Sequence, residues 1–370
     1  MTFITLVLFI AGLGLLIAGA NFLVRGASRL AAAMGISPLV IGLTVVAFGT
    51  SAPEAAVSMM ASLRGEADLS FGNVIGSNLF NILFILGISA AITPLVVSQK
   101  LVRIDVPIMI AVALLMTVLA WEGSIGRLDG AILFAVLIAY TLLSVRSAWR
   151  EKNEDVQNQY ARELGKRTTK GHRSTLWNFI LVFIGLLLLI IGSRWLVAGA
   201  VDVAMAFGVS ELIIGLTIVA AGTSLPEVAT SILAAVRGER DIAVGNIVGS
   251  NIFNILGVLG LAGIVSPDGI SVSSAAMRFD VPVMIAASVA CLPIFFRGHR
   301  ISRWEGFLLF GYYIAYAAFL ILNATKHDAL PVFSQIMLIF VIPLTALTFG
   351  VVWVRSYLRR GSAGSQPEFP

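Results

Sequence analysis

The sequence predicts an all-α, polytopic membrane protein built from two five-helix repeats of inverted topology, with an additional eleventh transmembrane helix near the C-terminus. The first reason is composition: 58% of the 370 residues are hydrophobic, only 12% are charged, and the mean hydropathy is +0.96. Soluble domains average about 25% charged residues, which excludes a soluble enzyme, a secreted disulfide scaffold and a disordered chain. The other reasons are eleven apolar stretches of spanning length and a long duplicated motif.

The apolar stretches define the predicted spans, because a transmembrane helix needs about 20 mostly apolar residues. They cover residues 3–24, 36–62, 70–92, 104–121, 127–145, 176–197, 209–235, 242–265, 280–296, 304–323 and 329–354. The resulting units are a first repeat at 1–146, a polar loop at 147–175, a second repeat at 176–323, an additional helix at 324–360 and a disordered tail at 361–370.

Basic residues predict the orientation in the membrane. If the loop at 147–175 lies on one side, that side collects 20 of the 25 lysines and arginines, and the other side only four. Basic residues concentrate in cytoplasmic loops. We therefore expect a multi-pass protein of a prokaryotic cytoplasmic (inner) membrane, with the N-terminus outside and the loop and C-terminus in the cytoplasm. The net charge of +5 reflects this topology, so no nucleic-acid partner is expected.

An internal repeat is the strongest feature of the chain. GLTVVAFGTSAPE at 42–54 recurs as GLTIVAAGTSLPE at 215–227, and GNVIGSNLFN at 72–81 recurs as GNIVGSNIFN at 245–254. Both pairs are 173 residues apart, and a shorter Arg-x-Asp-Val-Pro match follows at a spacing of 175. The repeat thus covers about five spans. Because five is odd, the second copy enters the membrane from the other side, as in secondary transporters with a site near the midplane.

Each copy of the first motif places a glutamate, Glu54 or Glu227, deep in a predicted span. A carboxylate at that depth costs about 2.5–3.5 kcal/mol on insertion scales, so it indicates a functional site. The proline before each glutamate is expected to break the helix and free a carbonyl, which is tolerated only where it faces protein or a water-filled cavity. Carboxylate, hydroxyl, carbonyl and amide oxygens together suit Ca²⁺ and other hard cations.

Neutral oxygens accompany both glutamates. The residues that supply them, either one turn before a glutamate or four residues apart on one helix face, are Thr50, Ser51, Thr223, Ser224, Ser77, Asn81, Ser250 and Asn254. A single proline or asparagine in a span is usually only a kink or an interhelical contact, but two matched copies with a carboxylate each favour an ion site. The glycines Gly72, Gly76, Gly245 and Gly249 are spaced for close helix approach.

At these residues the chain resembles the calcium/cation antiporter superfamily, which includes the sodium/calcium exchangers. The Gly-Thr-Ser-x-Pro-Glu and Gly-Ser-Asn-x-x-Asn motifs are similar to its two alpha-repeats, and the resemblance covers about residues 1–323. It implies a ten-helix exchanger core that moves Na⁺ and Ca²⁺ by alternating access and needs no cofactor. Carried over by position, the implied ion-binding residues are Ala47, Thr50, Ser51, Glu54, Ser77, Asn81, Ala220, Thr223, Ser224, Glu227, Ser250 and Asn254.

The chain departs from this pattern in two places. Many members carry a third carboxylate, an aspartate, at the position of Asn254. With asparagine there and at Asn81, two glutamates balance one Ca²⁺, so we expect no coupling to K⁺. The eleventh span lies outside the ten-helix core and is interpreted as an accessory or dimer-contact helix, which leaves a homo-oligomer open.

Taken together, the residues and the resemblance predict an antiporter that extrudes Ca²⁺ against Na⁺ entry. The sequence has no ATP-binding motif, so an ion gradient is expected to supply the free energy. Proton-coupled exchange, in which a glutamate is protonated in place of Na⁺ binding, stays open. A cation channel is disfavoured because channels usually arrange symmetric subunits around a pore. A membrane enzyme ranks last because no histidine or cysteine lies near the motifs.

Overall fold

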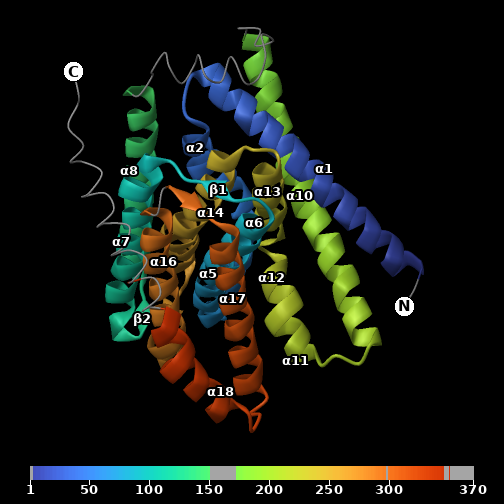
Figure 1. The fold of residues 1–370 in the computed structure, drawn as a ribbon, viewed down its shortest axis with the longest axis vertical. Coiled ribbons are helices and arrows are strands. Elements are labelled where there is room, and N and C mark those ends of the chain that lie inside the picture. Colours follow the sequence, from blue (N-terminus) through green and yellow to red (C-terminus); the bar gives the residue numbers. More distant parts are fainter. Residues whose placement is uncertain (1–2, 151–171, 297–298, 346–349, 351–370) are drawn as a thin grey trace, which may run out of the picture.

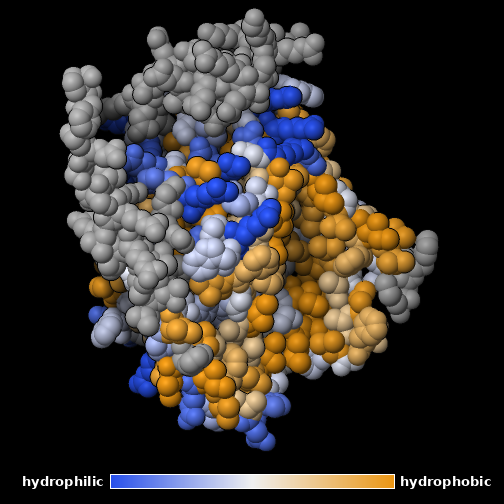
Figure 2. Space-filling view, viewed as in Figure 1, coloured by the Kyte–Doolittle hydropathy of each residue, from blue (hydrophilic) through white to orange (hydrophobic). Residues whose placement is uncertain are grey.

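The computed structural model describes residues 3–150, 172–296, 299–345 and 350, and helices dominate all of these ranges (Figure 1). Eight helices in this part of the chain are long and apolar enough to span a membrane, and the bent pair 38–50 and 52–63 forms a ninth candidate. Figure 2 shows hydrophobic side chains over the middle of the molecule and along α1 (Phe3–Met34). Hydrophilic groups lie towards the two ends of the molecule. The prediction of an all-α multi-pass membrane protein is confirmed.

The first half of the chain continues beyond α1 with short and long helices, π-helical segments (η1 to η3), one 3₁₀ turn (η4) and two short strands. These are α2 (Pro38–Ile41), η1 (Gly42–Val46), α3 (Ala47–Thr50), α4 (Ala52–Leu63), α5 (Ala67–Leu79), η2 (Phe80–Ile85), α6 (Leu86–Ile92), β1 (Leu95–Val96), η3 (Leu101–Asp105), α7 (Val106–Leu119), η4 (Ala120–Glu122), β2 (Ser124–Ile125) and α8 (Arg127–Arg150).

The second half repeats this order. Its elements are α10 (His172–Ala206), α11 (Glu211–Ile214), η5 (Gly215–Val219), α12 (Ala220–Gly222), α13 (Leu225–Val236), α14 (Arg240–Phe253), η6 (Asn254–Leu259), α15 (Gly260–Val265), β3 (Ile270–Ser271), η7 (Ala276–Asp280), α16 (Val281–Phe296), β4 (Arg300–Ile301) and α17 (Arg303–Ala324). The π-helical segments η5, η6 and η7 stand at the positions of η1, η2 and η3, so the duplicated sequence forms duplicated local structure. Such segments inside helices are frequent at functional sites.

Two antiparallel strand pairs connect the halves. β1 pairs with β4 and β2 with β3, with Leu95 opposite Ile301 and Ser124 opposite Ser271. Each pair therefore joins one strand of the first half to one strand of the second. The pairs lie at different heights of the bundle (Figure 1), as expected when the two halves are inverted relative to each other.

The long helices α1 and α10 pack along each other at one edge of the molecule (Figure 1). A Cβ atom on Gly19 would lie 2.8 Å from the carbonyl oxygen of Gly185, and one on Gly192 would lie 2.8 Å from that of Gly12. Only glycine allows this backbone approach, which is a common way to associate helices in a bilayer. The sequence interpretation missed these glycines, although they too recur at a spacing of 173 residues.

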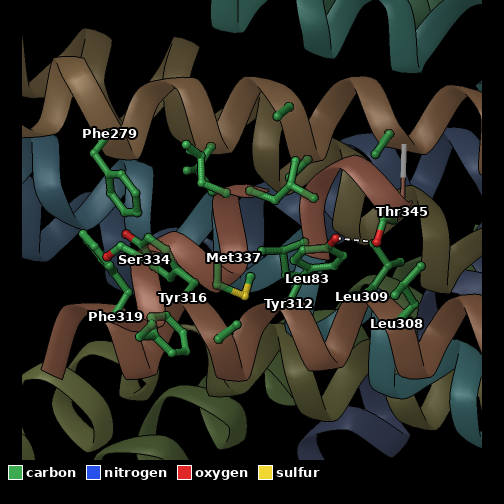
Figure 3. Close-up of a pocket in the computed structure, with 18 of the residues that line it drawn as sticks. Leu83, Phe279, Leu308, Leu309, Tyr312, Tyr316, Phe319, Ser334, Met337 and Thr345 are labelled. Atoms are coloured by element: carbon green, nitrogen blue, oxygen red, sulfur yellow. Dashed lines mark hydrogen bonds between the residues drawn. The ribbon is translucent and has the colours of Figure 1, made fainter. Parts of the chain in front are cut away.

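The C-terminal segment is shorter in the described residues than the predicted eleventh span. It contains α18 (Leu330–Ile336) and η8 (Met337–Val341), and its apolar helix extends to Thr345. The segment lies beside α16 and α17 and lines with them an apolar pocket of about 390 Å³ (Figure 3). Tyr312 donates a hydrogen bond to Thr345 across it at 2.7 Å. The full span over 329–354 stays a prediction, since most of its last residues lie outside the described ranges.

Candidate cation-binding site

Each glutamate of the repeats stands just after a break in its span. Helix α3 ends at Thr50 and α4 begins at Ala52, with a bend of 44° between them, and the second half breaks in the same way between α12 and α13. The prolines of the motifs occupy the first turn of α4 and α13, where a missing N–H costs no helical bond. Glu54 and Glu227 lie in the same turns, and a helix N-terminus favours negative charge. The expected helix breaks are therefore present.

Hydrogen bonds cross between the two halves at the glutamates. Ser51 donates to Oε1 of Glu227 at 3.0 Å, and Ser224 donates to Oε1 of Glu54 at 2.8 Å. Ser224 also contacts the hydroxyl of Ser77 at 3.4 Å. Both glutamates are only 1% exposed. The two carboxylates thus belong to one buried cluster at the interface of the repeats.

Many buried oxygens of the two sequence motifs have no hydrogen-bond partner, which is unusual for buried polar atoms. Among the residues singled out from the sequence, six buried side-chain oxygens are in this condition. They are Oε2 of Glu54, Oε2 of Glu227, Oδ1 of Asn81, Oγ1 of Thr223, Oγ of Ser250 and Oδ1 of Asn254. Buried acceptors without donors are what a dehydrated cation requires, and Ca²⁺ takes six to eight oxygens.

The two alanine carbonyls implied by the resemblance differ from each other. The carbonyl of Ala47 accepts from the amide of Ser51 at 3.0 Å and from the hydroxyl of Thr50 at 3.4 Å, so the helix break leaves it bonded. The equivalent bond from Ser224 to Ala220 is absent in the described structure, and Ala220 is exposed where Ala47 is buried. Access to the cluster is therefore unequal from the two sides.

Two asparagines at the start of the second motif support the cluster, and the sequence interpretation assigned them no role. Asn246 accepts from Thr50 at 3.1 Å and donates to Ser231 at 3.0 Å. Asn73 donates to Ser58 at 3.0 Å. Their recurrence at the spacing of 173 residues was the signal that could have identified them.

Asn254, which stands where many members of the superfamily carry an aspartate, is hydrogen-bonded to the other half of the protein. Its amide nitrogen donates to Oδ1 of Asn78 at 3.1 Å, and Asn78 in turn donates to the carbonyl of Asn251 at 3.3 Å. The described residues hold no group of three or more histidine, cysteine, aspartate or glutamate side chains placed to bind a metal. In that part of the chain, then, Glu54 and Glu227 have no third acidic residue beside them.

Comparison with known proteins decides the family. A family model described as sodium/calcium exchanger protein matches residues 4–146 and 177–322. The chain belongs to the sodium/calcium exchanger family. The putative antiporter CaxA of Alkalimonas amylolytica is 40% identical over 311 residues, which are 83% of this exchanger and 95% of CaxA. The sodium/calcium exchanger MaX1 of Methanosarcina acetivorans is 32% identical, over 78% of this chain and 90% of MaX1.

A solved structure of the sodium-calcium exchanger NCX_Mj, soaked with 2.5 mM Na⁺ and 0.1 mM Ca²⁺, is similar in fold. It is 31% identical, with a TM-score of 0.73 over 86% of this exchanger and 99% of that chain. These relatives are transporters, so the interpretation as an antiporter of cations rather than an enzyme is confirmed, as is the resemblance to the calcium/cation antiporter superfamily. Na⁺ and Ca²⁺ are the substrates of the family.

Proposed function

We propose that this exchanger extrudes Ca²⁺ in exchange for Na⁺, and that both ions use the buried cluster around Glu54 and Glu227 in turn. The observation that carries the proposal is the set of six unpartnered buried oxygens, contributed by both repeats and including one oxygen of each glutamate. Neutral oxygens complete a hard-cation shell around them. No single repeat could form this shell, because each serine that bonds a glutamate comes from the other half.

The charge of the cluster matches these substrates. Two carboxylates carry −2, which one Ca²⁺ or two Na⁺ ions neutralise. Buried charges without a counter-ion are strongly unfavourable, so an ion must leave only as another binds. This mutual exclusion is the basis of exchange, and it requires no source of free energy other than the ion gradients.

The direction of exchange follows from the ion gradients. An inward Na⁺ gradient drives Ca²⁺ outward through the site, whichever way the protein is oriented. For the orientation itself, we place the loop at 147–175 and the C-terminus in the cytoplasm because of the 20-to-4 distribution of basic residues.

Flux into proteoliposomes tests the coupling ion. Vesicles loaded with Na⁺ are diluted into Na⁺-free buffer with ⁴⁵Ca²⁺, and parallel vesicles carry a pH gradient, acidic inside, without Na⁺. We expect Ca²⁺ uptake only in the Na⁺-loaded vesicles, sensitive to external Na⁺. Uptake driven by the pH gradient alone would contradict Na⁺ coupling and favour the alternative, in which one of the unpartnered glutamate oxygens carries a proton.

A further inference from the structure

The segments that lead to the two helix breaks pack differently. On the side where α8 ends and α10 begins, here called the loop side, α2, η1 and α3 lie along α14 (Figure 1). On the opposite side α12 lies against α5, but α11 and η5 have no comparable contact with it. Val46 is fully buried, whereas its equivalent Val219 is 49% exposed. The segment before the glutamate is therefore tightly packed on the loop side, here called the closed side, and loosely packed on the opposite side, here called the open side.

Glycines show the same contrast at the level of the backbone. A Cβ atom on Gly249 would lie 2.7 Å from the Cα of Leu43, so α14 and η1 touch through their main chains. Its equivalent Gly76 has nothing within 4 Å of such an atom. Gly245 is likewise packed, and its equivalent Gly72 is likewise free. The sequence predicted close helix approach at all four glycines, and the structure shows it at only the two in α14.

One hydrogen bond also differs between the two sides. On the closed side Thr50 donates to Oδ1 of Asn246 at 3.1 Å. On the open side the equivalent pair is Thr223 and Asn73, and the buried hydroxyl of Thr223 has no partner. The amide nitrogen of Asn73 donates to the hydroxyl of Ser58 at 3.0 Å and to the carbonyl of Glu54 at 3.4 Å. A donor and an acceptor that are bonded in one half are thus apart in the other.

We propose that these contacts are two equivalent latches that close in turn, and that Asn246 and Asn73 are the positioning residues of the latches. In the opposite state, α11, η5 and α12 pack on α5 at Gly72 and Gly76, Thr223 donates to Asn73, and the Thr50 bond to Asn246 opens. The two halves have the same motif in inverted orientation, so each can make the contacts of the other. The proposal rests on the proposed exchange at one shared site, and it assigns the residues that switch its access.

Cysteine reporters, one in each half, can measure the accessibility of each latch separately. Val46 and Val219 each lie four residues before the threonine of their half, and they differ in exposure, 0% against 49%. Val46→Cys and Val219→Cys are made separately in a Cys291→Ser background, because Cys291 is the only other thiol of the chain. Their reaction rates with a water-soluble thiol reagent are measured in nanodiscs, where both sides are accessible. The rates report access directly, so they remain interpretable even if Na⁺-driven Ca²⁺ flux is not found.

Alanine at equivalent glycines provides matched variants. Gly76→Ala fits the structure described here but obstructs the opposite closure, so labelling of Val46→Cys is expected to fall about tenfold while Val219→Cys stays reactive. Gly249→Ala obstructs the closure seen here and is expected to act in reverse. Gly14→Ala, on an exposed face of α1 with nothing within 4 Å, is the control.

The asparagines separate a latch from a merely structural role. Asn246→Ala is expected to raise the rate at Val46→Cys and lower it at Val219→Cys, and Asn73→Ala to do the opposite. A loss of stability would raise both rates together. The proposal is overturned if the glycine variants leave the ratio of the two rates at the control value, or if both asparagine variants move that ratio in the same direction.

Discussion

At the scale of single residues, the two glutamates are held by the partner repeat rather than by their own. Ser51 and Ser224 each bond one oxygen of the opposite glutamate and leave the other oxygen unpartnered. A neutral serine fixes the position of a carboxylate without neutralising it. The proposed site is therefore preorganised for a cation, and its two carboxylates can supply a charge of −2 to the ions that bind there.

Removal of one of these charges gives the first prediction. Glu54→Gln and Glu227→Gln are each expected to abolish Ca²⁺ transport in the vesicle assay, because the amide keeps the volume but removes half of the negative charge. An alanine variant would add a cavity and confuse the two effects. Size-exclusion profiles and thermal unfolding should match the unmodified protein. Near-normal Ca²⁺ uptake by both glutamine variants would contradict the site.

Asn254 gives the second prediction, which concerns K⁺. With two acidic residues at the cluster, an added K⁺ beside Ca²⁺ would lack a counter-charge, and an unbalanced charge a few ångströms away costs several kcal/mol at low effective dielectric. Na⁺-driven Ca²⁺ flux is thus expected to proceed with choline in place of K⁺ on both sides. Asn254→Asp, which restores a third carboxylate, is the comparison variant. A strict K⁺ requirement in the unmodified protein would show that the residue at position 254 does not determine coupling to K⁺.

At the scale of elements, the α1–α10 pair is the most glycine-dependent contact between the halves. The approach at Gly19 and Gly185 brings backbones together without side chains between them. In a bilayer, where lipid is as apolar as the helices, such close packing replaces the hydrophobic effect as the source of association.

This contact gives the third prediction. Gly19→Leu is expected to destabilise the folded protein by about 1–3 kcal/mol, the usual cost of overpacking. Gly14→Leu in the same helix, with nothing within 4 Å, serves as the matched control. Thermal unfolding in one detergent compares them. Equal unfolding temperatures for Gly19→Leu and Gly14→Leu would show that α1 and α10 can move apart without a loss of stability.

The elements also show what the sequence could and could not predict. Span lengths and the doubled motif can be read directly from the sequence, so most of the spans, the helix breaks and the family followed from residues alone. The eleventh span stays a prediction. The predicted first span at 3–24 was too short, because α1 continues to Met34 beyond its apolar stretch. The unequal packing of Gly76 and Gly249 could not be predicted, since two copies of one motif carry no sign of which side is closed.

At the scale of the whole molecule, the halves are alike in sequence and unlike in access. The strand pairs and the α1–α10 contact join them, while the segments before the helix breaks differ. Alternating access needs this combination, because a symmetric closure on both sides would trap the ion and a symmetric opening would make a channel.

Orientation is the fourth prediction, and it concerns residues outside the described ranges. Tyr160→Cys in the loop and Ser365→Cys in the tail, each in a Cys291→Ser background, are expected to be protected from a membrane-impermeant thiol reagent added to intact cells. The reason is the concentration of basic residues on that side. Labelling should appear after the cells are permeabilised. Reaction of either site in intact cells would contradict the orientation.

The central claim is that one site shared by both repeats holds Ca²⁺ or Na⁺ but not both. Equilibrium binding of ⁴⁵Ca²⁺ to the purified protein, titrated with Na⁺ at constant ionic strength and pH, tests it most directly. We expect one Ca²⁺ per chain, displaced completely by Na⁺ with positive cooperativity, because two monovalent ions are needed to balance Glu54 and Glu227. Ca²⁺ binding that persists in saturating Na⁺, or that survives in the Glu54→Gln protein, would contradict it.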